Sequence, residues 1–433
     1  MKDATAGAAS AGARALSYEQ ALASILEHAA PIADEVVTLE QAHGRALAGH
    51  VNSGLELPPW DNAGMDGYAA RRNDILGASV EHPVTLTVRG TIAAGMSVDD
   101  VQVSPGECLR IMTGAPVPAG ADCVIRVEDS DRGDTVVKIV NERDAVGRGN
   151  IRPKGEDVRA GELLFGPGTT ITAAHLGVLA SIGQATVRVH RRTRVVIVSS
   201  GDELTTVDDS EAIESGTRIV ASSLYSLPPL FSLAGADVEV LPIVRDDLVA
   251  VSNALREALS RKPDLLVTTG GISVGAHDYT RDALVAVGGV LDFWRARIRP
   301  GGPIGTGTIH GVPWLGLPGN PVSTMVTGLL FAWPLIRKLG GHSRVYHRMI
   351  PVRMMERAET VAPLTHFLRG TLARGADGFI DAHISGPQGS NLMRTLAVSD
   401  ALLVVPESIS VVEPGTMLDA ILLPEAMLMA IAE

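Results

Sequence analysis

Leu265-Leu266-Val267-Thr268-Thr269-Gly270-Gly271 is a short apolar run that ends in two glycines. Two further runs of this kind are Val195-Val196-Ile197-Val198 and Trp314-Leu315-Gly316-Leu317. Stretches with a helical pattern separate the three runs. Strands that are apolar on both faces are typical of a parallel sheet covered by helices on each side. We therefore predict a doubly wound α/β domain over residues 192–342.

Strands and helices should alternate within this domain. The expected strands span 195–198, 238–243, 265–268, 291–294 and 314–317, and the expected helices span 224–233, 248–260, 279–287 and 321–339. Open parallel sheets bind ligands beyond the carboxyl ends of their strands. The loops at these ends are therefore the first candidates for a functional site.

The residues before the α/β domain divide into a helical part and a β-rich part. Residues 1–16 have the pattern of a disordered leader, and Ser17 with Gln20 forms a capping box for a helix that ends near His28. Further elements are expected as helices near 38–48 and 172–181 and as a strand over 186–190. Residues 17–57 and 148–191 should together form an N-terminal α+β domain.

Short β-type runs dominate the remaining sequence. Between residues 58 and 147 they span 84–89, 108–112, 123–127 and 135–140, which predicts a small, antiparallel, β-rich lid domain inserted into the N-terminal domain. Runs over 349–354, 367–372, 401–405 and 417–423 predict a small C-terminal β-domain over residues 343–433.

Composition excludes several classes of function. The formal net charge of −12 argues against a nucleic-acid partner, which needs a basic surface. The two cysteines and twelve histidines show no disulfide framework and no zinc-ligand spacing. The N-terminus lacks the apolar segment of a secretory signal, and the apolar stretch 417–433 is too short and interrupted to span a bilayer. We expect a cytoplasmic protein without a membrane partner.

The loops after the predicted strands carry polar and glycine residues. Asp202 and Glu203 follow the first strand, where adjacent carboxylates either ligate Mg²⁺ or complement the dipole of a helix N-terminus. Gly270 and Gly271 open a loop whose backbone N–H groups can approach an anion, and Asp278 ends it either as a functional carboxylate or as a helix cap. The loop 317–323 is either part of the same site or a turn that starts a helix with proline.

Basic residues and two rigid loops add to these candidates. Arg295, Arg297 and Arg299 alternate along one predicted strand, so they should share a face that suits oxyanions, unless they form a solvated basic edge. Loops 60–68 and 111–116 each hold a polar side chain in a Gly- or Pro-containing frame, as either a functional loop or an ordinary Asx-turn.

Together, and in this order, these loops resemble those of the molybdopterin molybdotransferase family, which includes bacterial MoeA and the gephyrin E domain. The resemblance runs from about Ser17 to the C-terminus. The stretches that carry it are Asp61-Asn62, Met65-Asp66-Gly67-Tyr68, Arg110-Ile111-Met112-Thr113-Gly114-Ala115-Pro116, Gly155-Glu156-Asp157, Ser200-Gly201-Asp202-Glu203-Leu204, Arg245-Asp246-Asp247, Gly270-Gly271-Ile272-Ser273-Val274-Gly275, Pro300-Gly301 and Leu317-Pro318-Gly319-Asn320-Pro321-Val322-Ser323.

The resemblance implies an enzyme that inserts molybdate into adenylylated molybdopterin and releases AMP in a Mg²⁺-dependent step. It implies a homodimer in which the α/β domain, similar to MoaB and Mog proteins, forms a cleft with the lid domain of the partner. The molybdopterin adenylyltransferase is a further candidate partner. The implied catalytic residues are Asp66, Thr113, Asp157, Glu203 and Asp278, and the implied metal ligands are Glu203, Asp246 and Asp278. Substrate and anion binding is assigned to Gly270, Gly271, Ser273, Gly275, Arg295, Arg299, Pro318, Gly319, Asn320, Ser323, Arg369 and Ser390.

Several positions depart from the family pattern. Arg295, Arg299 and Gly302 stand where lysines are usual, and Ala221 and Ser223 replace a usual Asp and Asn. An arginine keeps the charge but changes the geometry, whereas Gly302 removes a cation. Two alternatives therefore remain open: a molybdopterin adenylyltransferase, which the α/β domain alone resembles, and a molybdopterin-binding scaffold with weak or no activity.

Overall fold

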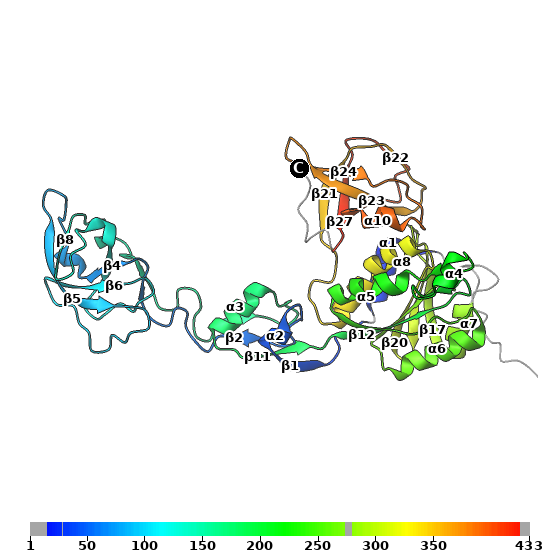
Figure 1. Cartoon of the computed structure of the whole chain (residues 1–433), viewed down its shortest axis with the longest axis horizontal. Helices are drawn as coiled ribbons and strands as arrows, with labels where there is room; N and C mark the ends of the chain where they lie inside the picture. Colours follow the sequence, from blue (N-terminus) through cyan, green and yellow to red (C-terminus); the bar gives the residue numbers. More distant parts are fainter. Residues whose placement is uncertain (1–14, 28, 273–278, 425–433) are drawn as a thin grey trace, which may run out of the picture.

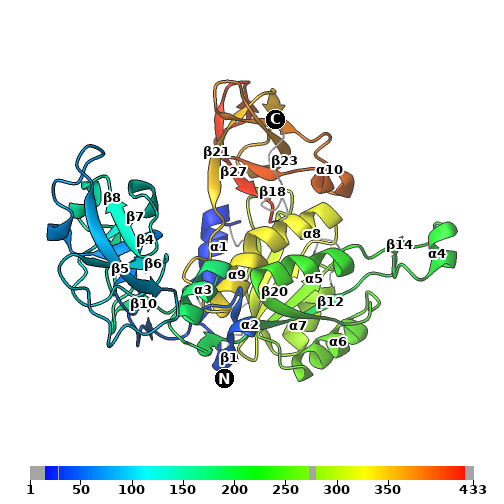
Figure 2. The same ribbon diagram turned by 60° about the vertical axis from the view of Figure 1, so that its left-hand side comes forward.

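The computed structural model describes residues 15–27, 29–272 and 279–424, and these form four parts in an elongated arrangement (Figure 1). The lid domain lies at one end, the N-terminal α+β domain lies in the middle, and the α/β domain lies at the other end beside the C-terminal domain. Figure 2 shows the same separation after a rotation of the molecule. In the described part of the chain, no helix is long and apolar enough to cross a membrane.

The α/β domain contains a six-stranded sheet in the order β15-β12-β16-β20-β19-β17. Its strands are β12 (Thr193–Ser199), β15 (Ala236–Val240), β16 (Leu265–Thr269), β17 (Gly289–Arg295), β19 (Pro303–Ile309) and β20 (Val312–Leu317). Neighbouring strands from β15 to β20 are parallel, whereas β19 is antiparallel to both β20 and β17. The chain leaves β12 toward β15 and then crosses to β16 on the other side, so the strand order reverses beside β12.

Helices cover both faces of this sheet, which confirms the predicted doubly wound fold. They are α5 (Ser223–Ala234), α6 (Leu248–Ser260), α7 (Tyr279–Ala286), and a continuous helical stretch formed by α8 (Pro321–Thr327), a π-helical turn (Gly328–Ala332) and α9 (Trp333–Leu339). Val195 and Ile197 pack in a core with Phe231 and Phe331, whereas Val196 and Val198 belong to the core on the opposite face. Adjacent residues of a strand point to opposite faces, so a strand buried on both sides must be apolar throughout.

The sequence prediction missed β19, and it was wrong to place Arg295, Arg297 and Arg299 along one strand. The chain leaves β17 at Arg295 and enters β18 (Ile298–Arg299), which pairs with β23 in the C-terminal domain. Between the two strands, the N–H of Arg297 donates to Leu16 O at 2.7 Å, and the Arg297 guanidinium bonds Glu407 at 3.0 Å. The alternation of basic residues therefore spans a crossing between two sheets and does not mark one face.

The N-terminal α+β domain has few long elements. It contains β1 (Asp34–Thr38), α2 (Leu39–Ala42), β2 (Val51–Asn52), β10 (Leu163–Phe165), α3 (Ala173–Ser181) and β11 (Thr186–His190). Helix α1 (Tyr18–Glu27) instead lies against the α/β domain, where Tyr18, Leu22 and Ile25 belong to its core (Figure 1). The capping box is present, because the Gln20 N–H donates to Ser17 Oγ at 3.2 Å and Ser17 N–H to Gln20 Oε1 at 3.0 Å. The helix expected over 38–48 is only one turn, since Gly44 has a φ of 76° and turns the chain so that Leu47 pairs with Val189.

The predicted leader needs one correction at its end. Leu16 pairs with Ala296 as an isolated parallel bridge and packs beside the α/β core, so it belongs to the fold. Residues 1–14 lie outside the described part of the chain.

The lid domain is a mixed sheet and not the purely antiparallel one that we predicted. Its order is β7-β4-β6-β5-β8, with β4 (Gly67–Ala70), β5 (Val84–Ile92), β6 (Glu107–Ile111), β7 (Cys123–Arg126) and β8 (Val136–Ile139). Strands β5 and β6 are parallel. Strand β4, which the sequence prediction treated as a loop, lies between β6 and β7 and is fully buried. Two short strands, β3 (Asn62–Ala63) and β9 (Ile151–Arg152), join the segments that enter and leave the lid.

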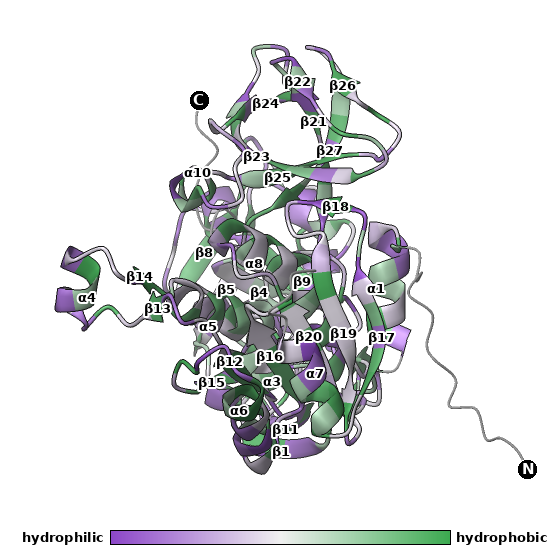
Figure 3. Cartoon of the chain, turned by 90° about the vertical axis from the view of Figure 1, so that its right-hand side faces the viewer, coloured by the Kyte–Doolittle hydropathy of each residue, from purple (hydrophilic) through white to green (hydrophobic). Residues whose placement is uncertain are grey.

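The C-terminal domain is a small barrel, as strand pairing shows. Its strands follow the order β18-β23-β24-β21-β27-β25, and pairing of β23 with β25 closes the sheet on itself. The bounds are β21 (Met349–Met354), β23 (Thr365–Arg374), β24 (Ile380–Ile384), β25 (Ala401–Val405) and β27 (Met417–Leu422), with the short helix α10 (Met393–Ala397). Buried apolar residues of these strands form one hydrophobic core. Figure 3 shows the hydropathy of the residues along the same strands.

Gly67 provides a test of the lid core. A Cβ at this position would lie 1.8 Å from Ile125 O in the neighbouring strand, a contact that only backbone movement can relieve. We expect Gly67→Ala to lower the free energy of unfolding of the lid by about 1–3 kcal/mol, as overpacking does. Hydrogen exchange of residues 67–70 and 107–126 in the full chain measures this effect.

The matched control is Gly54→Ala, because a Cβ there meets nothing within 4 Å. Equal exchange in the two variants would contradict the close packing of β4 against β7.

Candidate functional site

The carboxyl ends of β12, β16 and β20 lie side by side at one edge of the sheet. Thr269 Oγ1 donates to Ser199 Oγ at 2.9 Å, and Ser200 N–H donates to Thr269 O at 3.2 Å. Gly270 N–H donates to Leu317 O at 3.2 Å, which joins the second and third strand ends. The three loops that the sequence analysis singled out therefore begin at neighbouring points beside the reversal of strand order.

Glycine is required in this edge because the loops approach one another closely. Gly270 has a φ of 85°, and a Cβ there would lie 2.6 Å from Ser200 O. Gly271 has a φ of 61°, and its Cβ would lie 2.2 Å from Thr280 Oγ1. A Cβ on Gly319 would lie 3.5 Å from the Cα of Gly270, so the third loop touches the second. The N–H of Gly270 already donates to Leu317 O and is therefore not free to donate to a ligand.

The first strand end carries an exposed, mixed-charge cleft. Gly201 N–H donates to Val244 O at 3.1 Å, so the loop with Glu203 adjoins the loop with Asp246. Asp202 and Arg245 form an ion pair at 3.5 Å and line a cleft of about 810 Å³. A projecting arm formed by β13 (Leu204–Thr205), α4 (Ser210–Glu214) and β14 (Ile219–Val220) forms one side of this cleft (Figure 2).

The structure describes only two of the three carboxylates that we expected to bind a metal ion. Glu203 is exposed and Asp246 is half-buried on these two adjoining loops. Asp278, Ser273 and Gly275 lie outside the described residues. Within residues 15–27, 29–272 and 279–424, no three His, Cys, Asp or Glu side chains come close enough to hold a metal ion. Glu203 and Asp246, two of the three expected metal ligands, thus lie at the same edge of the sheet.

The third loop connects the α/β domain to the C-terminal barrel. Asn320 occupies the N-cap position of α8 without a side-chain capping hydrogen bond, Pro321 begins the helix, and Val322 N–H donates to Ser390 O at 3.0 Å. Ser390 and Ser323, which are far apart in the sequence, therefore lie beside the same helix start.

Arg369 on β23 organises the loop that carries Ser390. Its side chain is completely buried, and its Nη2 donates to Pro387 O at 2.9 Å and to Gly389 O at 3.1 Å. Its Nε donates to Thr395 Oγ1 at 2.8 Å, whereas its buried Nη1 has no hydrogen-bond partner. Burial lowers the pKa of the Arg369 guanidinium, because desolvation disfavours the charged form.

Arg369 and Arg299 line one pocket of about 440 Å³. The sequence analysis missed three of the other polar residues in this wall, His366, Arg357 and Gln388. His366 lies opposite Arg299 in the β18–β23 pairing. Its pKa is lowered mainly by burial and also by the charge of Arg299, against a smaller raising effect of its hydrogen bond with the Val361 backbone. Only Gln388 had a signal in the sequence, its position two residues before Ser390.

Arg295 and Gly302 lie apart from this pocket. Arg295 is exposed at the end of β17, at the same edge of the sheet as the strand-end loops. The backbone at Gly302 is crowded, since a Cβ on this residue would lie 3.2 Å from Ile298 O. Ala221 and Ser223 are buried at the start of α5, where Ala221 N–H donates at 2.9 Å to the carbonyl oxygen of Thr205, a residue that lines the charged cleft.

In the lid domain, Asp66 and Thr113 form a hydrogen-bonded pair. Thr113 donates to Asp66 Oδ1 through both its N–H and its Oγ1, each at 2.7 Å. The side-chain hydrogen bond and then the backbone one hold the pKa of the exposed Asp66 carboxyl below its usual range. Asp157 is exposed in the turn that leaves the lid, where its N–H donates to Leu57 O at 2.9 Å.

The candidate residues thus form two groups within one chain. The Asp66–Thr113 pair lies in the lid at one end of the elongated molecule, and the strand-end loops lie in the α/β domain at the other end (Figure 1). The N-terminal domain lies between them. One chain therefore does not bring all the predicted residues into a single cleft.

Comparison with known proteins follows the same division. Residues 16–183 match the MoeA N-terminal region (domain I and II), residues 196–338 match a probable molybdopterin binding domain, and residues 351–423 match the MoeA C-terminal region (domain IV). A molybdopterin molybdenumtransferase of Nostoc sp. is 35% identical, covering 86% of this chain and 85% of that protein. Molybdopterin molybdenumtransferase 2 of Mycobacterium tuberculosis is 35% identical, covering 93% and 97%.

A solved structure has the same overall fold. The molybdopterin biosynthesis moeA protein of Pyrococcus horikoshii OT3 superposes with a TM-score of 0.80 at 25% identity, covering 95% of this chain and 100% of that one. The four-part architecture is therefore shared along nearly the whole length.

The Asp66–Thr113 pair predicts a pH effect. The folded state lowers the pKa of Asp66. The hydrogen bonds from Thr113 to Asp66 therefore stabilise the lid at pH values above the ordinary carboxyl pKa, and this stabilisation is lost as the pH falls through the lowered pKa. Thr113→Val removes the side-chain donor and keeps the N–H donor. We expect the pKa of Asp66 to rise in this variant, as measured by NMR titration of its carboxyl carbon.

Thr85→Val, an exposed substitution in β5 of the same domain, should leave that titration unchanged. An unshifted Asp66 in Thr113→Val would mean that the hydroxyl bond is absent in solution.

Proposed function

Because the chain belongs to the MoeA family of molybdopterin molybdenumtransferases, we propose that it inserts molybdate into adenylylated molybdopterin, with release of AMP and molybdenum cofactor. The observation that carries this proposal is the arrangement of three family loops at adjoining strand ends, fixed by the Gly270–Leu317 and Ser200–Thr269 hydrogen bonds. This edge is where open α/β sheets bind nucleotide-like ligands.

Molybdopterin adenylyltransferase is the less favoured alternative. The probable molybdopterin binding domain matches only residues 196–338 of this chain. Most of the remaining residues match the MoeA N-terminal and C-terminal regions. The named relatives that match across most of the chain are molybdenumtransferases.

Anion binding falls to two neighbouring parts of the site. The loops with Gly271, Pro318 and Gly319 allow the backbone to approach a phosphate group closely. The pocket of Arg299 and Arg369 suits a small oxyanion such as molybdate, since the buried Nη1 of Arg369 is a charged donor without a partner among the described residues. Asn320, Ser323 and Ser390 lie between these two parts, at the start of α8. Arg295 contributes positive charge at the same edge.

Glu203, Asp246 and Asp278 are the carboxylates that we assign to Mg²⁺. The two described ones lie on adjoining loops and offer the oxygen ligands that this ion prefers. A divalent cation there would neutralise charge on the phosphate oxygens of the substrate. The residues Ser273 and Gly275 belong to the same loop as Asp278 in the sequence.

The lid residues complete this site from a second copy of the chain. Asp66, Thr113 and Asp157 lie far from the strand ends of their own α/β domain (Figure 1). A homodimer with its cleft between the lid of one subunit and the α/β domain of the other brings both groups together. Thr113 then keeps Asp66 ionised and oriented toward the substrate through its two hydrogen bonds. We place this dimer in the cytoplasm, with the molybdopterin adenylyltransferase as the donor of its substrate.

The direct test is incubation of the protein with adenylylated molybdopterin, molybdate and Mg²⁺. We expect AMP release that requires molybdate and that chelation of Mg²⁺ abolishes. Glu203→Gln should lower the rate about 100-fold or more, the scale on which loss of an electrostatic group at a reacting centre acts.

Glu211→Gln, on the exposed arm helix α4, is the matched control and should keep the wild-type rate. A folded protein that binds the substrate but releases no AMP would instead be a scaffold, and the proposed activity would be lost.

Mixing of two inactive variants tests the shared cleft. One variant carries Asp66→Ala and the other carries Glu203→Ala. In a heterodimer of these two variants, one of the two clefts has both Asp66 and Glu203 intact. Random mixing of equal amounts should therefore restore about a quarter of the wild-type AMP release, since half of the dimers are heterodimers with one intact site each. No recovery after confirmed subunit exchange would place both residues in a cleft within one chain.

A further inference from the structure

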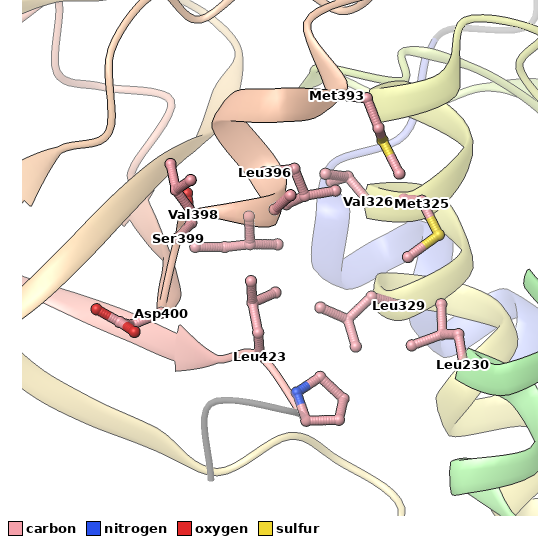
Figure 4. A pocket seen from close by; sticks show the side chains of 13 residues that line it. Leu230, Met325, Val326, Leu329, Met393, Leu396, Val398, Ser399, Asp400 and Leu423 are labelled. Atoms are coloured by element: carbon pink, nitrogen blue, oxygen red, sulfur yellow. The ribbon is translucent and has the colours of Figure 1, made fainter. Parts of the chain in front are cut away.

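An apolar pocket of about 390 Å³ lies where the C-terminal barrel meets the helices of the α/β domain (Figure 4). Leu230 of α5, Met325 of α8 and Leu329 of the π-helical turn form one side, and Met393 and Leu396 of α10 form another. Their side chains point toward a common space in the close view. None of the candidate site residues that the structure describes lines this pocket, so it is distinct from the site proposed above.

The polar groups in the wall are already satisfied within the protein. Ser399 Oγ bonds Ser385 Oγ at 2.8 Å, and Asp400 Oδ2 accepts from Leu372 N–H at 2.8 Å. Most of the surface that remains for an occupant is apolar. A largely apolar occupant therefore fits the pocket, and Met325 and Met393 can adapt their flexible side chains to it.

The chain itself delivers an apolar segment to this pocket. Leu423 N–H donates to Asp400 O at 2.9 Å, which anchors the chain at the wall, and Pro424 is itself a lining residue. The sequence continues as Glu425-Ala426-Met427-Leu428-Met429-Ala430-Ile431-Ala432-Glu433, an apolar run between two acidic residues. No linker separates the pocket from this run, so its local concentration at the pocket is high.

We propose that the apolar side chains of residues 425–433 dock in this pocket and fasten the C-terminal barrel to the α/β domain. The bound segment would contact α10 of the barrel and α8 of the α/β domain at once. The same two bodies meet at the Val322–Ser390 hydrogen bond. Docking of the segment therefore fixes the position of the barrel loop over the start of α8.

Methyl NMR of the full chain with ¹³C-methyl methionine tests this proposal. Met325 and Met393 report on the pocket, and Met96, half-exposed in the lid, is an internal reference. Removal of residues 425–433 should shift the Met325 and Met393 resonances and increase their broadening by a soluble paramagnetic agent. Met96 should not change.

Two full-length variants separate apolar docking from a general effect of the segment. Met427→Ser/Leu428→Ser/Ile431→Ser should reproduce the deletion, whereas Glu425→Gln/Glu433→Gln should resemble the wild type. Equal broadening of Met325 and Met393 in all four proteins would overturn the proposal. Protection that disappears on dilution of the full chain would also overturn it, because the occupant would then be a second copy.

Discussion

Main-chain hydrogen bonds across the carboxyl ends of β12, β16 and β20 set the geometry on which the rest of the molecule depends. The bonds from Ser200 N–H to Thr269 O and from Gly270 N–H to Leu317 O hold three loops in contact where the strand order reverses. The contact is so close that positions 270 and 271 exclude any side chain. Parallel strands place these ends at one edge, and the apolar faces of the sheet, buried under helices on both sides, keep that edge rigid.

A buried charge links this edge to the C-terminal barrel. The Arg369 side chain donates three hydrogen bonds, two to carbonyl oxygens and one to a hydroxyl oxygen. Among the residues that the structure describes, it bonds no carboxylate. Burial of a guanidinium is costly unless its donors are satisfied, and one nitrogen is not. The protein tolerates this cost while Arg369 holds the loop whose Ser390 O meets α8. In the proposed function, the same side chain would also attract an oxyanion to the neighbouring pocket.

The elongated arrangement has a functional consequence. A lid that is separated from the α/β domain by the whole N-terminal domain is poorly placed to cover the strand-end loops of its own chain (Figure 1). Its Asp66–Thr113 pair is nevertheless preorganised, with two 2.7 Å bonds to one carboxylate oxygen. A carboxylate held ionised in this way fits the proposed dimer, in which the α/β domain of the second chain would present the ligand.

The sequence by itself determined the doubly wound domain, the positions of most of its elements and the loops that carry the candidate site. It could do so because strands buried on both faces and glycines in close turns leave a strong local pattern. It did not reveal β4 or β19, since Gly67-Tyr68-Ala69-Ala70 and the glycine-rich β19 become strands only by pairing with neighbours that bury them. The alternating arginines were misleading for a related reason, because the chain changes sheets between Arg295 and Arg299. Only the tertiary structure decided which distant residues meet, such as Asp66 with Thr113 and Ser390 with Val322, because those contacts depend on how whole domains pack and not on local sequence.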